Sequence, residues 1–246
     1  MFRIGVIGYG FRISSVIRMM MSFDEKIRII AITDIDFDKV RMNLAENGIE
    51  PDSVRLYADS DEMMDNEELD GIMVGTRCSQ HAGYGIKVLR RNIPLYLEKP
   101  VATNMNELLE LKREYEKSAG KVVVSFPLRV TPLVRLAKEI VDSGRLGSIE
   151  HVQAINNVPY GGAYYHSWYR DEDETGGLFL QKATHDFDYI NHLLGLMPTD
   201  VCAITSKQIF KGNRRAGLRC EDCNERNTCP EGPHMMKFVR FDAPGG

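Results

Sequence analysis

The sequence predicts an α/β fold, with a doubly wound parallel sheet first and a smaller α+β domain after it. Over the first 125 residues, short runs rich in Val, Ile and Leu alternate with longer stretches of helical periodicity. Continuous apolar strands separated by helices are typical of a parallel sheet covered on both faces. A glycine-containing turn follows the first apolar run directly, as it does where such a sheet connects its first strand to a helix.

The elements follow in order along the chain. In the first domain we expect strands over residues 3–7, 28–33, 71–74, 95–97 and 122–125. Helices are expected between them, over residues 12–22, 38–47, 80–91 and 106–119. In the second domain we expect a helix after Val130, a turn over 142–147, a helix over 177–194, and strands over 148–158, 201–209 and 237–241. We place the boundary near residue 125, which gives domains of residues 1–125 and 126–246.

Composition excludes several classes of function. The formal net charge is −4 and the pI is about 5.9, so the chain lacks the basic face that nucleic acid would require. No apolar run approaches the roughly 18 residues of a membrane span, and glycines and arginines interrupt any signal peptide near the start. Five cysteines without a secretion signal indicate reduced thiols and a cytoplasmic location.

The first glycine turn has the features of a phosphate-binding turn. It reads Gly8-Tyr9-Gly10-Phe11-Arg12-Ile13 and follows a predicted strand. Gly8 suits a tight turn, and Gly10 would let the backbone approach a pyrophosphate at the start of the next helix. The usual third glycine is replaced by Ile13, which weakens the motif. A lone turn of this kind is more often an ordinary glycine turn.

An acidic residue at the end of the second predicted strand strengthens the case for a dinucleotide. Asp34 follows Ile13 by 21 residues. At that spacing a carboxylate binds the adenosine ribose hydroxyls and repels a 2′-phosphate, which favours NAD over NADP. Asp34 could instead be a helix N-cap, although Asp36 is better placed for that role.

Two further segments follow predicted strands at the same edge of the sheet. One contains Thr76 and His81, and the other is Glu98-Lys99-Pro100. Ligands of open α/β sheets bind beyond the carboxyl ends of the strands, so both segments are candidates for the cofactor site. Pro100 holds Lys99 in an extended conformation, which directs its ammonium toward the crevice.

These motifs together resemble the Gfo/Idh/MocA family of NAD(P)-dependent oxidoreductases. The resemblance spans residue 3 to about residue 195 and is most selective at Glu98-Lys99-Pro100. It implies a Rossmann domain followed by an α+β domain with an open, mostly antiparallel sheet that often mediates dimers or tetramers. It also implies sugars, inositols or related polyols as substrates. Similar proteins are longer, so we expect this chain to be incomplete at its C-terminus.

The predicted helix over 177–194 carries a polar stripe. Its members, spaced to lie on one face, are Gln181, His185, Asp188 and His192. The opposite stripe, expected to pack inward, is Ala183, Phe187, Ile190 and Leu194. From periodicity alone the polar stripe is as readily a solvated surface, but the family resemblance implies that His185 is the catalytic histidine.

Alcohol oxidation explains the need for these groups. Neutral His185 would take the hydroxyl proton as general base. Lys99 would stabilise charge on the same oxygen, and Asp188 would orient His185. Many relatives carry Asp where this chain has Gln181, so either it works without that Asp or its catalysis is impaired. A non-catalytic NAD-binding sensor and an NAD-assisted lyase or glycosidase are the alternatives.

Two further segments remain open in function. The aromatic segment 160–170 suits stacking on a sugar ring, and equally an edge loop packed on a sheet. Cys220, Cys223, Cys229 and His234 have the ligand count of a structural zinc site, although their spacing is not standard and a loop with free thiols is the stronger interpretation. No metal is expected at the catalytic site, because hydride transfer does not require one.

Overall fold

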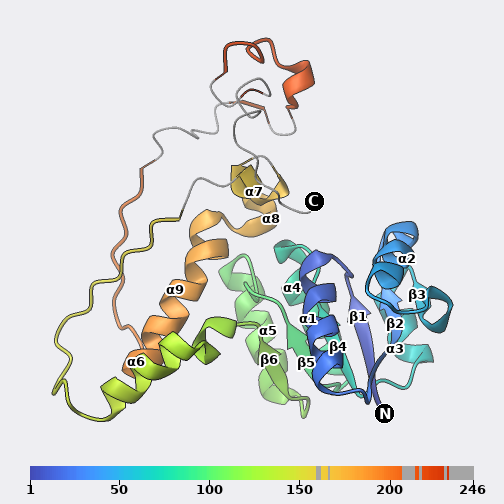
Figure 1. The fold of residues 1–246 in the computed structure, drawn as a ribbon, viewed down its shortest axis with the longest axis horizontal. Coiled ribbons are helices and arrows are strands. Elements are labelled where there is room, and N and C mark those ends of the chain that lie inside the picture. Colours follow the sequence, from blue (N-terminus) through green and yellow to red (C-terminus); the bar gives the residue numbers. More distant parts are fainter. Residues whose placement is uncertain (159–161, 166, 207–213, 216–217, 230–231, 233–246) are drawn as a thin grey trace.

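The computed structural model describes residues 1–158, 162–165, 167–206, 214–215, 218–229 and 232. Its centre is a six-stranded parallel sheet in the order β3-β2-β1-β4-β5-β6 (Figure 1). The strands are β1 Phe2–Ile7, β2 Ile27–Thr33, β3 Arg55–Tyr57, β4 Gly71–Val74, β5 Leu95–Leu97 and β6 Val122–Val124. The predicted parallel sheet is confirmed. β3 was missed, because its three residues, Arg-Leu-Tyr, do not form an apolar run like those of the other strands.

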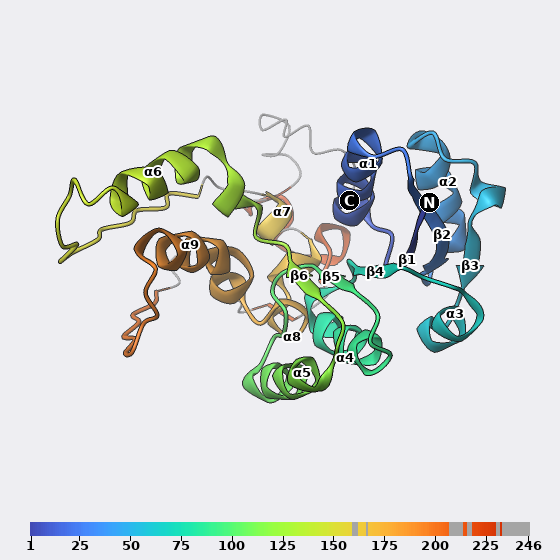
Figure 2. The same ribbon diagram turned by 90° about the horizontal axis from the view of Figure 1, so that it is seen from below.

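Helices cover both faces of this sheet. Figure 2 shows α1 (Phe11–Phe23) and α2 (Phe37–Glu46) on one face, and α3 (Ser60–Asn66), α4 (His81–Arg90) and α5 (Met105–Lys117) on the other. Each face has its own apolar core. Ile13, Ile17, Val40 and Leu44 pack under α1 and α2, whereas the other core includes Met63, Met64, Ile86, Leu89 and Leu111. The sequence is apolar along whole strands because both of their faces are buried.

Side chains cap most of the helices in this domain. The Asp36 carboxylate accepts a hydrogen bond from the Lys39 amide at 3.0 Å, as expected for an N-cap. Asp59 and Asn104 cap α3 and α5 in the same way. Helix α1 differs, because Gly10 precedes it and no side chain caps its first turn. The amide groups at the start of α1 are therefore left for another acceptor.

Beyond β6 the described chain consists of helices and irregular segments, without a strand. The short helix η3 (Pro127–Val130) leads into α6 (Pro132–Asp142), which lies beside α9 (Leu178–Leu194) next to the β6 edge of the sheet (Figures 1 and 2). Three short segments precede α9 and lie near the carboxyl ends of the strands: α7 (Gly162–Tyr165), η4 (Trp168–Arg170) and α8 (Glu172–Thr175). Within the described ranges, no helix combines the length and apolar character that crossing a membrane requires.

Two predicted strands of the second domain are wrong. Residues 148–158 and 201–206 belong to no ladder, and apolar side chains in them, including Ile155 and Ile204, are exposed. A segment becomes a strand only when a neighbour pairs with its backbone. Among the described residues no such neighbour lies beside them. Residues 207–209 and the predicted strand over 237–241 lie outside the described residues.

Candidate active site

The glycine turn between β1 and α1 is shaped for a close backbone approach. Gly8 has a φ of 80°, and a side chain there would meet Thr76 Cγ2 at 2.7 Å. The turn therefore lies so close to the loop after β4 that only glycine fits at this position. A side chain at Gly10 would meet nothing within 4 Å, so the space beside the uncapped start of α1 is open. Free amides at a helix N-terminus bind phosphate, and the turn fits a dinucleotide pyrophosphate.

The residue that replaces the third glycine is completely buried. Ile13 lies on α1 and packs against Gly75, where an added Cβ would stand 2.6 Å from the Ile13 Cβ. The close approach of helix and strand is therefore made possible by a glycine at the end of β4. Gly75 is a packing position that the glycine motif alone did not identify. Its place directly after an apolar strand was the available signal.

The carboxylate of Asp34 lies beside the same turn. Its Oδ2 accepts a hydrogen bond from the Tyr9 amide at 2.7 Å, and its Oδ1 accepts one from the Asp36 amide at 3.1 Å. The first bond joins the end of β2 to the phosphate turn. Phe11, which begins α1, is exposed at the other side of the turn.

His81 is buried and connects the loops after β4 and β5. Only 2% of the residue is exposed. Its Nδ1 lies 2.7 Å from the Pro100 carbonyl oxygen, and its Nε2 lies 3.1 Å from the Thr76 carbonyl oxygen. Burial lowers the pKa of the imidazole, so a neutral His81 donates to one carbonyl. The structure places this predicted cofactor residue where it holds the loops after β4 and β5 together.

Glu98 and Arg12 connect the phosphate turn to the end of β5. The Arg12 Nε donates to Glu98 Oε1 at 3.2 Å, and the Glu98 carboxylate is almost completely buried. The Tyr96 hydroxyl lies 3.4 Å from the same carboxylate oxygen and donates to Ser125 Oγ at 3.0 Å. The guanidinium of Arg12 is therefore fixed beside the start of α1, where a pyrophosphate would be bound.

Lys99 lies against α9, one helical turn before His185. The Lys99 ammonium donates to the backbone carbonyl of Gln181, one helical turn before His185. Burial lowers the pKa of Lys99. The edge of the Phe126 ring contacts the His185 ring, with centroids 5.8 Å apart. The two residues predicted to be catalytic thus come together, although 86 positions separate them in the chain.

His185 is a neutral imidazole at neutral pH. Its pKa is lowered to about 4, first by burial and then by the positive charges of Lys99, Lys182 and Arg12, which Asp186 only partly offsets. Its Nδ1 is buried and has no hydrogen-bond partner among the described residues. An imidazole in this state accepts a proton and is not already protonated.

The expected partner of His185 is engaged elsewhere. Asp188 forms a bidentate ion pair with Arg129 of η3. In this pair the Arg129 Nε donates to Asp188 Oδ2 at 2.8 Å. The prediction that Asp188 orients His185 is therefore wrong. The pair instead fixes α9 to the segment that leaves β6.

The inward face of α9 also differs from the prediction. Gln181 of the polar stripe is 7% exposed, whereas Phe187 of the apolar stripe is 49% exposed and contacts Phe179 on the surface. On this face Asp188 pairs with Arg129, and the Gln181 backbone carbonyl accepts a hydrogen bond from Lys99. Periodicity identified two faces and could not tell which one meets the sheet.

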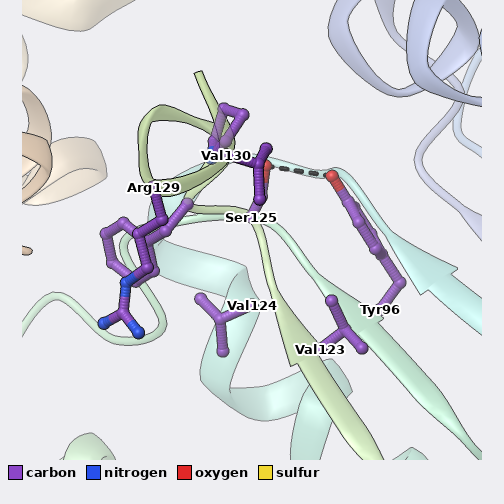
Figure 3. Close-up of a pocket in the computed structure, with 8 residues that line it drawn as sticks. Tyr96, Val123, Val124, Ser125, Arg129 and Val130 are labelled. Carbon is purple, nitrogen blue, oxygen red and sulfur yellow. Dashed lines mark hydrogen bonds between the residues drawn. The ribbon is translucent and has the colours of Figure 1, made fainter. Parts of the chain in front are cut away.

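A cavity of about 550 Å³ adjoins this junction (Figure 3). Its walls come from β5, β6 and η3 and comprise Tyr96, Val123, Val124, Ser125, Phe126, Pro127, Arg129 and Val130. Figure 3 shows the hydrogen bond between Tyr96 and Ser125 at its rim. Lys99 and His185 are outside this lining, but Phe126, which contacts the His185 ring, is part of it.

The aromatic segment packs on the loop after β4. The Arg77 guanidinium lies 4.3 Å from the centroid of Trp168, which stacks on Tyr169 at 4.0 Å. Ser79 donates to Glu174 of α8 at 2.6 Å. These contacts join the segment before α9 to the loop after β4. Residues 159–161 and 166 of the segment lie outside the described residues.

No metal-binding cluster is found in the described part of the chain. Cys220, Cys223 and Cys229 are free thiols there. The fourth ligand of the possible zinc site, His234, lies outside the described residues.

Family models match most of the chain. One, described as an oxidoreductase family with an NAD-binding Rossmann fold, matches residues 2–126. Another, described as the GFO/IDH/MocA C-terminal domain, matches residues 134–222. Together the two matched ranges reach from β1, through α9, to the segment that contains Cys220.

Individual relatives agree with these matches. The Bacillus subtilis (strain 168) protein YteT is 34% identical over 179 residues, which are 69% of this chain and 42% of YteT. The myo-inositol 2-dehydrogenase of Thermotoga maritima is 25% identical over 218 residues, covering 87% of this chain and 61% of the relative. The structure of myo-inositol 2-dehydrogenase from Lactobacillus plantarum superimposes with a TM-score of 0.70 at 23% identity, covering 79% of this chain and 56% of that one.

The chain thus spans between 42% and 61% of the length of these proteins. The matched part of this chain contains the glycine turn, Lys99 after β5 and His185 of α9. The resemblance inferred from the motifs is confirmed: the chain belongs to the Gfo/Idh/MocA family of oxidoreductases.

Proposed function

We propose that the protein is an NAD-dependent dehydrogenase that oxidises a secondary alcohol of a sugar, sugar acid or polyol. The observation that carries the proposal is the meeting of Lys99 with α9 one turn before His185. An ammonium and a neutral imidazole beside the same crevice are the two groups that alcohol oxidation needs. The relative named myo-inositol 2-dehydrogenase supports a polyol or sugar as the substrate.

The cofactor would be held along the carboxyl edge of the sheet. Its pyrophosphate fits the turn at Gly8 and Gly10, beside Arg12, and its adenosine ribose fits next to the Asp34 carboxylate. Asp34 favours NAD because its negative charge repels a 2′-phosphate. Thr76 and Glu98 complete the walls on the side of β4 and β5. Bound nicotinamide supplies the hydride acceptor.

The protein's own residues handle the proton. The substrate hydroxyl gives its proton to the His185 imidazole while the C–H bond on the same carbon breaks. The electron pair of the O–H bond then forms the new carbonyl. The Lys99 ammonium stabilises negative charge on that oxygen during the step. Burial prepares both groups, because it keeps His185 neutral and removes water from around Lys99.

A panel of polyols, aldoses and sugar acids with NAD, monitored by nicotinamide absorbance, tests the proposal. Reduction of NAD with at least one member of the panel is the expected result. Because Gln181 cannot ionise as the Asp of many relatives does, a non-catalytic NAD-binding sensor is the second candidate. Tight NAD binding without reduction by any substrate would favour it. Cleavage of a sugar chain without accumulation of reduced cofactor would indicate an NAD-assisted lyase or glycosidase.

We further propose that the enzyme works in the cytoplasm as a homo-oligomer. The free thiols of the described residues suit a reducing compartment, and the family resemblance implies a dimer or tetramer. Light scattering coupled to size-exclusion chromatography measures the oligomeric state, and a monomeric mass would contradict this part of the proposal.

A further inference from the structure

Two contacts, in the same order, join α9 to the segment that leaves β6. The rings of Phe126 and His185 meet edge to face, with centroids 5.8 Å apart and planes at 87°. Three residues later on each segment, Arg129 pairs with Asp188. Residues three positions apart face the same way in the 3₁₀ geometry of η3 and on an α-helix. The ion pair therefore fixes the register in which Phe126 meets His185.

The backbone that carries Phe126 is held by the sheet. The Phe126 amide donates to the Val124 carbonyl at 2.8 Å, and the preceding amide, of Ser125, donates to the Leu97 carbonyl at 3.0 Å. Ser125 is buried, and its hydroxyl accepts a hydrogen bond from the Tyr96 hydroxyl at 3.0 Å. The phenyl ring thus has a fixed support, which the positioning of a catalytic side chain requires.

The hydrogen bond that would orient the His185 imidazole at Nδ1 is missing from the described residues. That nitrogen is buried and has no partner there. Asp188, the carboxylate expected to orient the ring, is held by Arg129. A catalytic histidine commonly has its ring fixed by a hydrogen bond at the nitrogen that does not react. Another interaction has to fix the plane of this ring.

We propose that Phe126 positions the His185 imidazole for proton transfer, by holding the plane of the ring and by keeping water away from it. The inference rests on the proposed function, since it concerns the base of the same reaction. Phe126 acts through His185 and is a positioning residue. The edge-to-face contact restrains the imidazole because rotation of either ring would lose the favourable geometry.

Phe126 also separates His185 from the neighbouring cavity. Its side chain lines that cavity of about 550 Å³, whereas His185 is outside the lining. A shorter side chain at position 126 would extend the cavity toward the imidazole and admit water. Burial is the largest cause of the lowered pKa of His185, so water beside the ring would raise that pKa.

A substitution at position 126 leaves every charge around His185 in place. These charged groups are Lys99 after β5, Arg12 on α1, Lys182 and Asp186 on α9, and the pair of Asp188 with Arg129 of η3. A change in the pKa of His185 in a Phe126 variant therefore reports the lost ring contact and the entry of water. It does not report the loss of a charged neighbour.

The test measures the pKa of His185 by NMR in protein with isotope-labelled histidine, whose signal is assigned by its loss in His185→Gln. In the natural protein the imidazole should stay neutral down to about pH 5, because its pKa is about 4. In Phe126→Ala the pKa should rise toward the ordinary value of 6.5. With any substrate that reduces NAD, kcat should fall about 10–100-fold, with KM changed little.

Two further variants control the measurement. Phe126→Leu keeps an apolar side chain against the imidazole and should recover most of kcat and most of the low pKa. Phe187→Ala makes the same substitution on α9, at a half-exposed side chain that packs on Phe179, and should change neither quantity. Titration with NADH shows that each variant is folded. If Phe126→Ala does not bind NADH, Phe126→Val takes its place, with the same direction of change expected.

The outcomes separate this inference from the proposed function. A pKa of His185 that is equal in the Phe126 variant and the natural protein would overturn the inference, whether or not turnover is found. A loss of kcat as large in Phe187→Ala as in Phe126→Ala would also overturn it. Absence of turnover with every substrate would count against the dehydrogenase. The NMR titration still decides the inference in that case, because it requires no substrate.

Discussion

The Lys99 ammonium and the Gln181 carbonyl form a hydrogen bond that joins the end of β5 to α9. The bond therefore links the sheet to the second part of the chain. Because Gln181 lies one turn before His185, the bond also sets the distance between the two groups to which we assign catalysis. The activity of the protein should therefore depend on both Lys99 and His185.

Removal of either catalytic group should abolish turnover. We expect Lys99→Ala and His185→Ala each to reduce kcat by about 10²–10⁴-fold, the range for loss of a positioned acid–base group. NAD affinity should change little, because the pyrophosphate and ribose sites lie at Gly8, Gly10 and Asp34. Steady-state kinetics and fluorescence titration with NADH measure the two effects. Retained turnover in one variant would remove that residue from the mechanism.

Replacement of Asp34 should change the cofactor preference. Asp34→Ala removes the negative charge beside the phosphate turn and also the acceptor for the Tyr9 amide. We expect NAD to bind about tenfold more weakly and the discrimination against NADP to fall. Asp36→Ala, which removes a carboxylate of α2 that acts only as a cap, is the control. An unchanged ratio of NAD to NADP affinity in Asp34→Ala would show that this carboxylate is not at the ribose.

The low pKa of His185 should appear in the pH dependence of stability. Between pH 6.5 and about 4 the unfolded chain binds a proton at this residue and the folded chain does not. The free energy of unfolding therefore falls as the pH falls through this window. Because His185 is only half-buried, we expect a contribution of about 1 kcal/mol. The charged groups that set it are Lys99, Lys182, Arg12 and Asp186.

Urea unfolding at about pH 7 and about pH 5 checks this expectation. His185→Gln should lose less stability over this range than the natural sequence, and the difference between the two isolates the contribution of His185 from those of the other histidines. Equal losses would mean that the imidazole titrates normally in the folded protein.

Gly75 should be as sensitive to substitution as a glycine of the phosphate turn. In Gly75→Ala the new Cβ would stand 2.6 Å from the Ile13 Cβ, which belongs to a fully buried residue and cannot move freely. Such overpacking costs about 1–3 kcal/mol in the free energy of unfolding. Gly83→Ala is the matched control, because a Cβ on that helical glycine meets nothing within 4 Å, and alanine there should stabilise α4 by up to about 1 kcal/mol. Equal stability of Gly75→Ala and the natural protein would contradict the packing argument.

The sequence by itself determined most elements of the first domain and their order. Apolar runs identified five of the six strands, the glycine turn marked the start of α1, and Pro100 placed Lys99 in an extended segment at a strand end. These properties are local: a run of β-branched residues or a proline restricts the backbone regardless of what lies opposite. Parallel strands then bring their carboxyl ends to one edge, which is why Asp34, Thr76 and Lys99 could be assigned to one site.

Only the tertiary structure decided which side chains meet. It turned the polar face of α9 inward, paired Asp188 with Arg129 and not with His185, buried His81 between two carbonyls, and moved the close helix–strand contact to Gly75. Each of these depends on a neighbour distant in the chain. Hydrogen bonds, ion pairs and packing form between whatever surfaces the fold brings together, and a one-dimensional pattern does not contain that choice.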